Sequence, residues 1–312
     1  MKPEILMVGP MMPQLMAALE RDYIVHRLWE APERDALLKK IGSNVKAIAT
    51  NGALGASGSL INALPNLEII ALYGVGVDAI DLSLAKKRGI PVTTTPDVLT
   101  EDVADMALAL LLATARRIVV GDQYVRTGQW ARGEMVLTRR VNGKRVGILG
   151  LGRVGKALAK RLEALNMKIS YTNRKELDVP YAYYRDLVKM AGDVDFLVVT
   201  AAGGDATRKI VNRPVLEALG PNGILINVSR GSIVDEKALI HAIKEGNLGG
   251  AGLDVFASEP NVPEELKSMP NVVLQPHHAS GTIETRSAMG DLVARNLEAH
   301  FAGKPLLTPF NY

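Results

Sequence analysis

Short apolar runs alternate with amphipathic segments along the chain. The runs are continuous rather than alternating, which is typical of parallel strands covered on both faces. We expect strands at residues 5–8, 47–50, 68–72, 146–149, 169–172, 196–200, 224–228 and 272–275. Helical spacing is found between them, including residues 154–165, 235–244 and 289–301. Strands and helices in this alternation predict an α/β fold built from doubly wound, Rossmann-like parallel sheets.

The pattern starts again near the middle of the chain, which indicates two domains. A first α/β block covers roughly residues 1–95, and a long helix that opens at Thr100 follows it. That helix contains the apolar stretch 106–115, which is too short to span a bilayer, so we expect it to be buried. The second block begins near Arg145, and the pattern does not show which block the last helix joins.

Composition is that of an ordinary globular protein, with 47% hydrophobic and 22% charged residues among 312. That length also favours two domains. The chain has no cysteine, so disulfides and thiol chemistry are excluded, and a reducing, cytoplasmic location is the simplest expectation. The first residues, MKPEILMVGP, predict no signal peptide.

The charge balance is mildly basic, with 37 Lys and Arg against 33 Asp and Glu, a net charge of +4. Such an excess suits an anionic small molecule. The basic residues are spread along the chain and aromatics make up only 4%, so we expect no nucleic-acid partner and no membrane partner.

A glycine-rich turn follows the strand predicted at 146–149. Gly150, Gly152 and Gly155, with Arg153 and Val154 between them, form a GxGxxG pattern that leads into a helix. The first glycine permits the sharp turn, the second lets the backbone approach a pyrophosphate, and the third allows close packing of helix and strand. The N–H groups that open the helix then face the phosphates. The pattern predicts dinucleotide binding.

The next strand ends in an unusual sequence for an NAD-binding protein. An acidic residue there would bind the 2′-hydroxyl of the adenosine ribose, but this chain has Asn173, Arg174 and Lys175. Arg174 can bind a phosphate with two hydrogen bonds and Lys175 adds a charge, which favours NADP(H). Glu176 and Asp178 soften the positive field and leave use of NAD(H) open. The alternative is a solvated basic loop.

Three polar residues follow three predicted strands. Arg230, Glu259 and His277 each come just after a strand, at the edge where open parallel sheets build their sites. An arginine can bind a carboxylate, a histidine can exchange a proton with a carbonyl or alcohol oxygen, and a carboxylate can orient the imidazole and favour its protonated form. A surface ion pair for Arg230 and simple turn chemistry for Glu259 remain alternatives. The pattern does not decide between His277 and His278.

Five segments identify a family resemblance that covers nearly the whole chain. They are YGVGVDAIDL (73–82), ILGLGRVGKALAKRL (148–162), LINVSRGSIVDEKAL (225–239), GAGLDVFASEPNVP (250–263) and LQPHHASGTIETR (274–286). With them the chain resembles the D-isomer-specific 2-hydroxyacid dehydrogenases. Within that family it is most similar to bacterial NADPH-dependent glyoxylate/hydroxypyruvate reductases.

The resemblance implies particular roles for individual residues. Arg230 would bind the substrate, Glu259 would be the partner carboxylate and His277, rather than His278, the acid/base. The backbone N–H groups of Val75 and Gly76 would hold the substrate carboxylate. Cofactor contacts would include Val228 and Asp254, the latter at the nicotinamide carboxamide. No His, Asp or Glu cluster has metal-ligand spacing, so we expect no metal.

The resemblance also implies an architecture and a reaction. Residues 1–98 with 286–312 would form a substrate-binding domain and residues 99–285 a dinucleotide-binding domain, with the active-site cleft between them. The reaction would be reduction of a small 2-oxoacid, and the protein a homodimer that pairs through its cofactor domains. Trp130 lies in a stretch that reaches the neighbouring site in some relatives.

Two alternatives stay open. The first is another 2-hydroxyacid dehydrogenase of the same family, acting on phosphoglycerate or a bulkier 2-oxoacid. The second is a non-catalytic dinucleotide-sensing protein of the corepressor type. One departure from the family concerns the stretch after strand 196–200. Many relatives have a His-x-Pro-like sequence there, whereas this chain has Ala201-Ala202-Gly203-Gly204.

Overall fold

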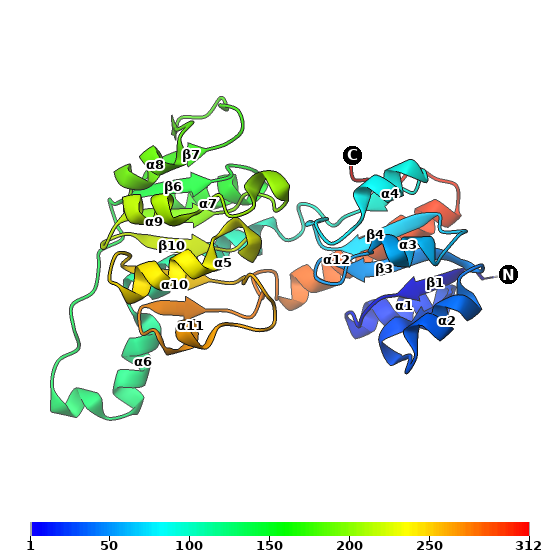
Figure 1. Ribbon diagram of the computed structural model, residues 1–312, viewed down its shortest axis with the longest axis horizontal. Coiled ribbons are helices and arrows are strands. Elements are labelled where there is room, and N and C mark those ends of the chain that lie inside the picture. Colours follow the sequence, from blue (N-terminus) through cyan, green and yellow to red (C-terminus); the bar gives the residue numbers. More distant parts are fainter. Residues whose placement is uncertain (1, 312) are drawn as a thin grey trace. The chain divides into compact units, whose positions relative to one another are not determined.

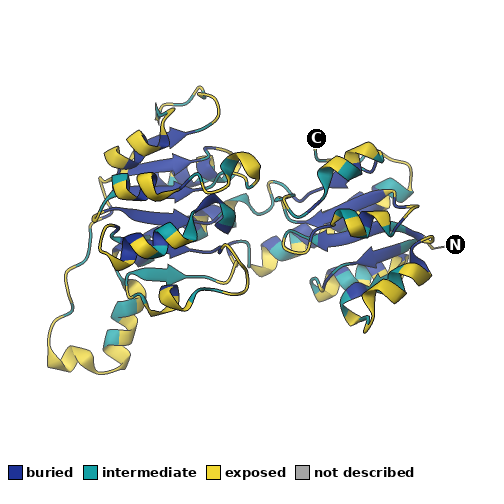
Figure 2. Ribbon diagram, viewed as in Figure 1, coloured by how far each residue is buried: buried dark blue, intermediate teal, exposed yellow. Residues whose placement is uncertain are grey.

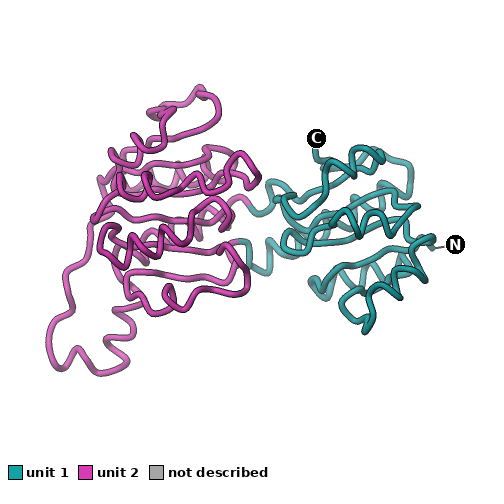
Figure 3. Tube along the Cα trace, in the orientation of Figure 1, with its two compact units in different colours: residues 1–99, 280–312 teal, residues 100–279 magenta. Residues whose placement is uncertain are grey.

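The structure is a computed structural model that describes residues 2–311, and it divides into two compact units (Figure 3). Unit 1 comprises the residues up to Leu99 and those from Ser280 onwards, and unit 2 comprises Thr100–Ala279. Within unit 1, the buried Thr285 donates a hydrogen bond of 3.2 Å from its hydroxyl to the Val98 carbonyl and so joins the two parts of the chain that form this unit. The division into a substrate-binding and a dinucleotide-binding domain stays a prediction.

Unit 1 is built on a five-stranded parallel sheet in the order β2-β1-β3-β4-β5 (Figure 1). Its strands are β1 (Glu4–Met7), β2 (Ile24–Arg27), β3 (Val45–Asn51), β4 (Ile69–Tyr73) and β5 (Val92–Thr93). Its helices are α1 (Pro13–Asp22), η1 (Leu28–Glu30), α2 (Arg34–Ile41), α3 (Gly58–Asn62), α4 (Leu82–Lys87) and α12 (Ile283–Phe301).

Alternate residues of the unit 1 strands face two separate cores. Along β1, Ile5 and Met7 pack in one cluster with Leu15 of α1 and Val293 of α12. Leu6, between them, packs in the other cluster, where α2, α3 and α4 also contribute. Both faces of the sheet are thus covered, which explains why the strands are continuous apolar runs (Figure 2).

Unit 2 is built on a seven-stranded parallel sheet in the order β12-β11-β10-β9-β6-β7-β8. Its strands are β6 (Arg145–Leu149), β7 (Lys168–Thr172), β8 (Ala182–Tyr183), β9 (Phe196–Val199), β10 (Ile224–Asn227), β11 (Gly250–Leu253) and β12 (Val272–Leu274). Its helices are α5 (Thr100–Ala115), α6 (Ile118–Arg126), η2 (Gln129–Arg132), α7 (Arg153–Glu163), α8 (Leu187–Asp193), η3 (Asp205–Thr207), α9 (Arg213–Leu219), η4 (Gly231–Ile233), α10 (Glu236–Lys244) and α11 (Glu264–Ser268).

Helices cover both faces of this second sheet as well. On one face, α8, α9 and α10 enclose a cluster that includes Leu197 and Leu225 from the central strands. α5 lies against β10 and β11 and also packs on α7. At Gly252 of β11 an added Cβ would lie 2.9 Å from the Thr114 hydroxyl of α5, so the glycine lets this helix approach the sheet closely.

The predicted elements agree with the observed ones, and the fold class is confirmed as two parallel α/β sheets. The predicted buried helix is α5, and among the described residues no helix is long and apolar enough to cross a membrane. One helix differs: α12 begins at Ile283, well before the predicted 289. Thr282 caps it by accepting a hydrogen bond of 3.1 Å from the Thr285 N–H, so the helix starts in a polar segment.

Candidate active site

The order of strands in unit 2 reverses beside β6. The chain passes from β6 to β7 on one side and later returns to β9 on the other side of β6. In open α/β sheets a ligand binds outside the carboxyl ends of the strands at such a reversal of strand order. The glycine-rich turn lies at this point, between the end of β6 and the start of α7.

The three glycines of the turn have the geometry that a dinucleotide requires. Gly150 has a φ of +99°, and an added Cβ there would lie 2.4 Å from the Ala201 backbone. An added Cβ at Gly155 would lie 2.6 Å from the Gly150 carbonyl oxygen. No atom lies within 4 Å of the corresponding position at Gly152, which leaves that side open for a pyrophosphate. The first turn of α7 carries no acidic residue, and its N-cap Gly152 has no side chain to cover the free N–H groups, so the turn fits the phosphates of NAD(P).

The basic loop follows β7, the neighbour of β6. Arg174 and Lys175 are exposed, and within residues 2–311 neither makes a hydrogen bond or an ion pair. The side chain of Asn173 instead accepts a hydrogen bond of 2.8 Å from the Leu151 N–H, inside the glycine-rich turn. This contact joins the loop to the turn. The two cations are therefore available to a ligand on the same edge of the sheet.

His277 and Glu259 form a hydrogen-bonded pair past the ends of β12 and β11. The Nδ1 atom of His277 lies 2.6 Å from Oε2 of Glu259, and the other carboxylate oxygen accepts a 3.0 Å bond from the Phe256 N–H. Arg230, which follows β10, interacts electrostatically with Glu259. Glu259 thus engages Nδ1 of His277, and the His277 side chain is 41% exposed. The three residues expected from the sequence thus meet at one edge of the sheet.

The backbone at His277 adopts a left-handed conformation, with a φ of +52°. Asp254, which is fully buried, holds this turn in place: its carboxylate accepts hydrogen bonds of 2.7 and 3.0 Å from the N–H groups of His278 and Ala279. The Asp254 carbonyl accepts a further 2.8 Å bond from the His277 N–H. Burial raises the pKa of Asp254 against the effect of these bonds. The family resemblance implies a cofactor contact for Asp254, and the sequence gives no sign that this residue also supports the turn.

The remaining predicted residues lie in several places. Val228, buried, directly follows β10. Arg153 and Val154 are the first two residues of α7 and lie between Gly152 and Gly155 of the glycine-rich turn. Val75 and Gly76 belong to unit 1, in the loop after β4 that is fixed by a 2.8 Å bond from the Thr95 N–H to the Gly74 carbonyl.

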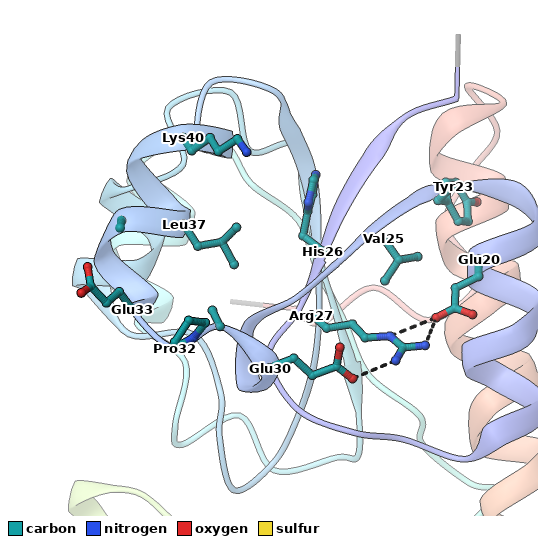
Figure 4. A pocket seen from close by; sticks show the side chains of 12 residues that line it. Glu20, Tyr23, Val25, His26, Arg27, Glu30, Pro32, Glu33, Leu37 and Lys40 are labelled. Atoms are coloured by element: carbon teal, nitrogen blue, oxygen red, sulfur yellow. Dashed lines mark hydrogen bonds and ion pairs between the residues drawn. The ribbon is translucent and has the colours of Figure 1, made fainter.

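The structure also has a groove away from the predicted site residues. This groove has a volume of about 890 Å³ and lies beside β2. Figure 4 shows its lining side chains, among which Arg27 bonds Glu20 and Glu30. The groove contains none of the predicted site residues and lies at the edge of the unit 1 sheet remote from β4. Within residues 2–311 no group of three or more His, Asp or Glu side chains could hold a metal ion.

The pKa of Glu259 lies below its usual value of 4.5. Burial alone would raise this pKa, but the hydrogen bonds from His277 and from the Phe256 N–H lower it, as does the charge of Arg230. Ionised Glu259 therefore stabilises the folded protein. Because its pKa is lowered on folding, this stabilisation is complete above about pH 4.5 and is lost as the pH falls through the lowered value.

The variant Glu259→Gln keeps the shape of the side chain and removes its charge. We expect the free energy of unfolding of the wild type to exceed that of the variant by a constant amount at neutral pH. This difference should shrink steadily below pH 4.5. Urea unfolding of both proteins between pH 7 and pH 3 measures it. A difference that does not change over this range would contradict the charged pair.

A doubly wound sheet with a dinucleotide turn, an arginine and a His–Glu pair on one edge defines a dinucleotide-dependent oxidoreductase. Residues 108–279 match the model of the D-isomer specific 2-hydroxyacid dehydrogenase, NAD binding domain. The chain belongs to the D-isomer-specific 2-hydroxyacid dehydrogenase family, which confirms the resemblance and the NAD(P)-binding assignment.

Within the family, the chain is similar over nearly its full length to several reductases of 2-oxoacids. The chain is 52% identical over 306 residues to glyoxylate/hydroxypyruvate reductase A of Arabidopsis thaliana, covering 98% of each chain. It is 50% identical to hydroxyphenylpyruvate reductase of Plectranthus scutellarioides, again over 98% of each. A solved structure of NADPH-dependent glyoxylate/hydroxypyruvate reductase from Sinorhizobium meliloti, in complex with NADP and malonate, is similar with a TM-score of 0.94 at 46% identity. This match covers 99% of the present chain and 97% of the Sinorhizobium chain.

Proposed function

We propose that the protein reduces a small 2-oxoacid, glyoxylate or hydroxypyruvate, to the 2-hydroxyacid with NADPH. The observation that carries this proposal is the His277–Glu259 pair, 2.6 Å apart, with Arg230 acting on the same carboxylate. These groups provide a proton donor and a carboxylate-binding cation on the sheet edge where the glycine-rich turn lies. A protein that only senses dinucleotides needs neither.

Each residue of the proposed site performs a separate task. Arg230 binds the substrate carboxylate and draws electron density from the neighbouring carbonyl. His277 donates a proton from Nε2 to the carbonyl oxygen as it becomes an alcohol, while Glu259 holds Nδ1 and fixes the ring orientation. When bound, the reduced nicotinamide supplies the hydride. The family resemblance extends the proposal to the N–H groups of Val75 and Gly76 as further carboxylate ligands, and so to unit 1 as the substrate-binding domain.

The cofactor preference rests on the loop after β7. Arg174 and Lys175 are exposed and without other partners in the described chain, as a 2′-phosphate site requires. The Sinorhizobium relative, at 46% identity, is an NADPH-dependent glyoxylate/hydroxypyruvate reductase. Glu176 and Asp178 are also exposed, so we propose that NAD(H) is accepted with lower affinity.

Initial rates with a panel of 2-oxoacids, each with NADPH and with NADH, test the proposed function. We expect the highest kcat/KM for glyoxylate or hydroxypyruvate with NADPH. A bulkier substrate is a second candidate because of the 50% identity to hydroxyphenylpyruvate reductase, so the panel includes hydroxyphenylpyruvate. Cofactor oxidation that does not depend on any 2-oxoacid would reject the proposal.

We also propose that the protein forms a homodimer through unit 2. The segment from residue 118 to residue 137 contains α6 and η2, neither of which has a buried residue, and it is mostly exposed (Figure 2). Its large apolar side chains are exposed as well, with Trp130 at 67% and Leu137 at 99%. The others are Ile118, Val119, Val125 and Val136. Apolar surface gathered in one segment of a folded protein marks an interface, and pairing of two copies covers it.

Light scattering during size-exclusion chromatography tests this assembly. We expect the wild type to have twice the 33.6 kDa mass of the chain. Val119→Arg combined with Val125→Arg should give the monomer mass, because burial of two unpaired charges opposes pairing. The control Val188→Arg changes an exposed valine of α8 in the same unit and should stay dimeric. A monomeric wild type would refute the proposal.

A further inference from the structure

The loop that carries Arg174 and Lys175 is held by hydrogen bonds at Asn173 and Leu177, whereas its charged side chains make none within the described chain. Arg174, Lys175 and Glu176 are exposed in sequence between the half-buried Asn173 and Leu177. The loop joins β7 to β8, which are neighbours in the sheet with Tyr171 paired to Tyr183. A short exposed loop of this kind samples many conformations unless its ends are bonded.

The first anchor is the hydroxyl of Tyr171. This side chain points into the core from β7 and is 0% exposed. Its hydroxyl accepts a hydrogen bond of 2.8 Å from the Leu177 N–H and lies 3.1 Å from the Leu177 carbonyl oxygen, to which it donates. One buried phenol thereby bonds both backbone polar groups of Leu177, whose carbonyl also accepts a 3.0 Å bond from the Val179 N–H. These bonds close the far end of the segment from residue 173 to residue 177, the part of the β7–β8 loop that carries the two cations.

The second anchor lies at the near end of the loop. Asn173 accepts the 2.8 Å bond from the Leu151 N–H through its side chain, and its carbonyl accepts a 3.2 Å bond from the Tyr183 hydroxyl. The rings of Tyr171 and Tyr183 are in contact, with centroids 5.4 Å apart. The basic loop is thus fixed to the glycine-rich turn at one end and to the core at the other.

We propose that Tyr171 is a positioning residue for cofactor selectivity, which holds Arg174 and Lys175 ready for the 2′-phosphate of NADP(H). This inference rests on the proposed NADPH preference and deepens it. A loop that is already ordered loses less conformational entropy when it binds the phosphate. NAD(H) has no 2′-phosphate and does not use the two cations. Loosening the loop therefore weakens NADP(H) binding and leaves NAD(H) binding nearly unchanged.

The variant Tyr171→Phe removes the hydroxyl and keeps the ring in the core. Calorimetric titration without substrate gives the Kd values of NADP⁺, NAD⁺ and the fragment adenosine 2′,5′-bisphosphate. We expect the first and third Kd values to rise about fivefold, the loss of one to two ordinary hydrogen bonds, and that of NAD⁺ to stay within about twofold. The control is Tyr184→Phe, whose hydroxyl bonds Asp193 at 3.1 Å outside the loop. It should change none of them.

Comparison with the double variant Arg174→Ala/Lys175→Ala separates two kinds of failure. If the double variant leaves the ratio of the NADP⁺ and NAD⁺ Kd values unchanged, the NADPH preference itself is wrong. If it lowers the selectivity but Tyr171→Phe does not, only the positioning role is wrong. Equal weakening of both cofactors by Tyr171→Phe would also overturn the inference. Should this variant fail to fold, Tyr183→Phe removes the hydroxyl that bonds the Asn173 carbonyl, one of the two bonds of the second anchor, and a smaller loss with the same selectivity is expected.

Discussion

Replacing His277 by asparagine is expected to lower kcat for 2-oxoacid reduction by about 10²–10⁴-fold, the usual contribution of a general acid. Asparagine has no proton to donate at the position of Nε2. It tolerates the left-handed backbone at residue 277, where φ is +52°, better than alanine does. The change should therefore remove the chemistry without distorting the turn. Steady-state rates with NADPH, together with the NADPH Kd from titration, measure the two effects separately.

The neighbouring histidine supplies a matched control. His278 donates only its backbone N–H to Asp254, and this bond survives a change of side chain. We expect His278→Asn to keep kcat within about threefold of the wild type, as for a surface change. NADPH affinity should be nearly the same in both variants. A His277→Asn enzyme with near-normal turnover, or a larger loss in His278→Asn, would contradict the assignment of the proton donor.

Removing both cations of the basic loop is expected to reverse or abolish the cofactor preference. In Arg174→Ala/Lys175→Ala we expect kcat/KM for NADPH to fall about 10²-fold, since two charge-assisted contacts with phosphate are lost. The value for NADH should change little, because its ribose carries a hydroxyl in place of the phosphate. Initial rates at varied concentrations of each cofactor give both values.

A control must remove the same charge elsewhere on the same sheet. Lys144 and Lys168 are exposed and lie next to each other where β6 and β7 begin, at the end of these strands opposite to the basic loop. The Lys168 N–H bonds the Lys144 carbonyl at 2.9 Å. The variant Lys144→Ala/Lys168→Ala should keep the wild-type ratio of NADPH to NADH. If both double variants lower the ratio equally, the effect comes from net charge, and a specific phosphate site is excluded.

The sequence predicts the frame of the molecule well because parallel strands buried on both faces are continuous apolar runs. The eight strands predicted from such runs are all present, with ends shifted by one or two residues. Short edge strands such as β8, of two residues, give no such run. The polar start of α12 was missed for a related reason, since a capping threonine and not an apolar face sets its beginning.

The candidate site is predictable only in part. Residues just past parallel strands must share one edge of the sheet, so the meeting of Arg230, Glu259 and His277 follows from topology. The buried contacts that support them depend on tertiary packing instead. Asp254 bonds a turn more than twenty residues away, and Tyr171 closes a loop through backbone groups that have no sequence signature. The choice of His277 over His278 came from family resemblance, and the structure pairs the His277 ring with Glu259.

The central claim, that the protein transfers hydride from NADPH to the C2 carbon of a small 2-oxoacid, is tested most directly with a deuterium label. Hydroxypyruvate is reduced in separate reactions with NADPH carrying deuterium on either face of C4 of the nicotinamide, and the product is analysed by NMR and chiral chromatography. We predict D-glycerate that carries deuterium at C2 from one labelled cofactor and none from the other. A product without deuterium in both reactions, or no product at all with any 2-oxoacid, would contradict the account.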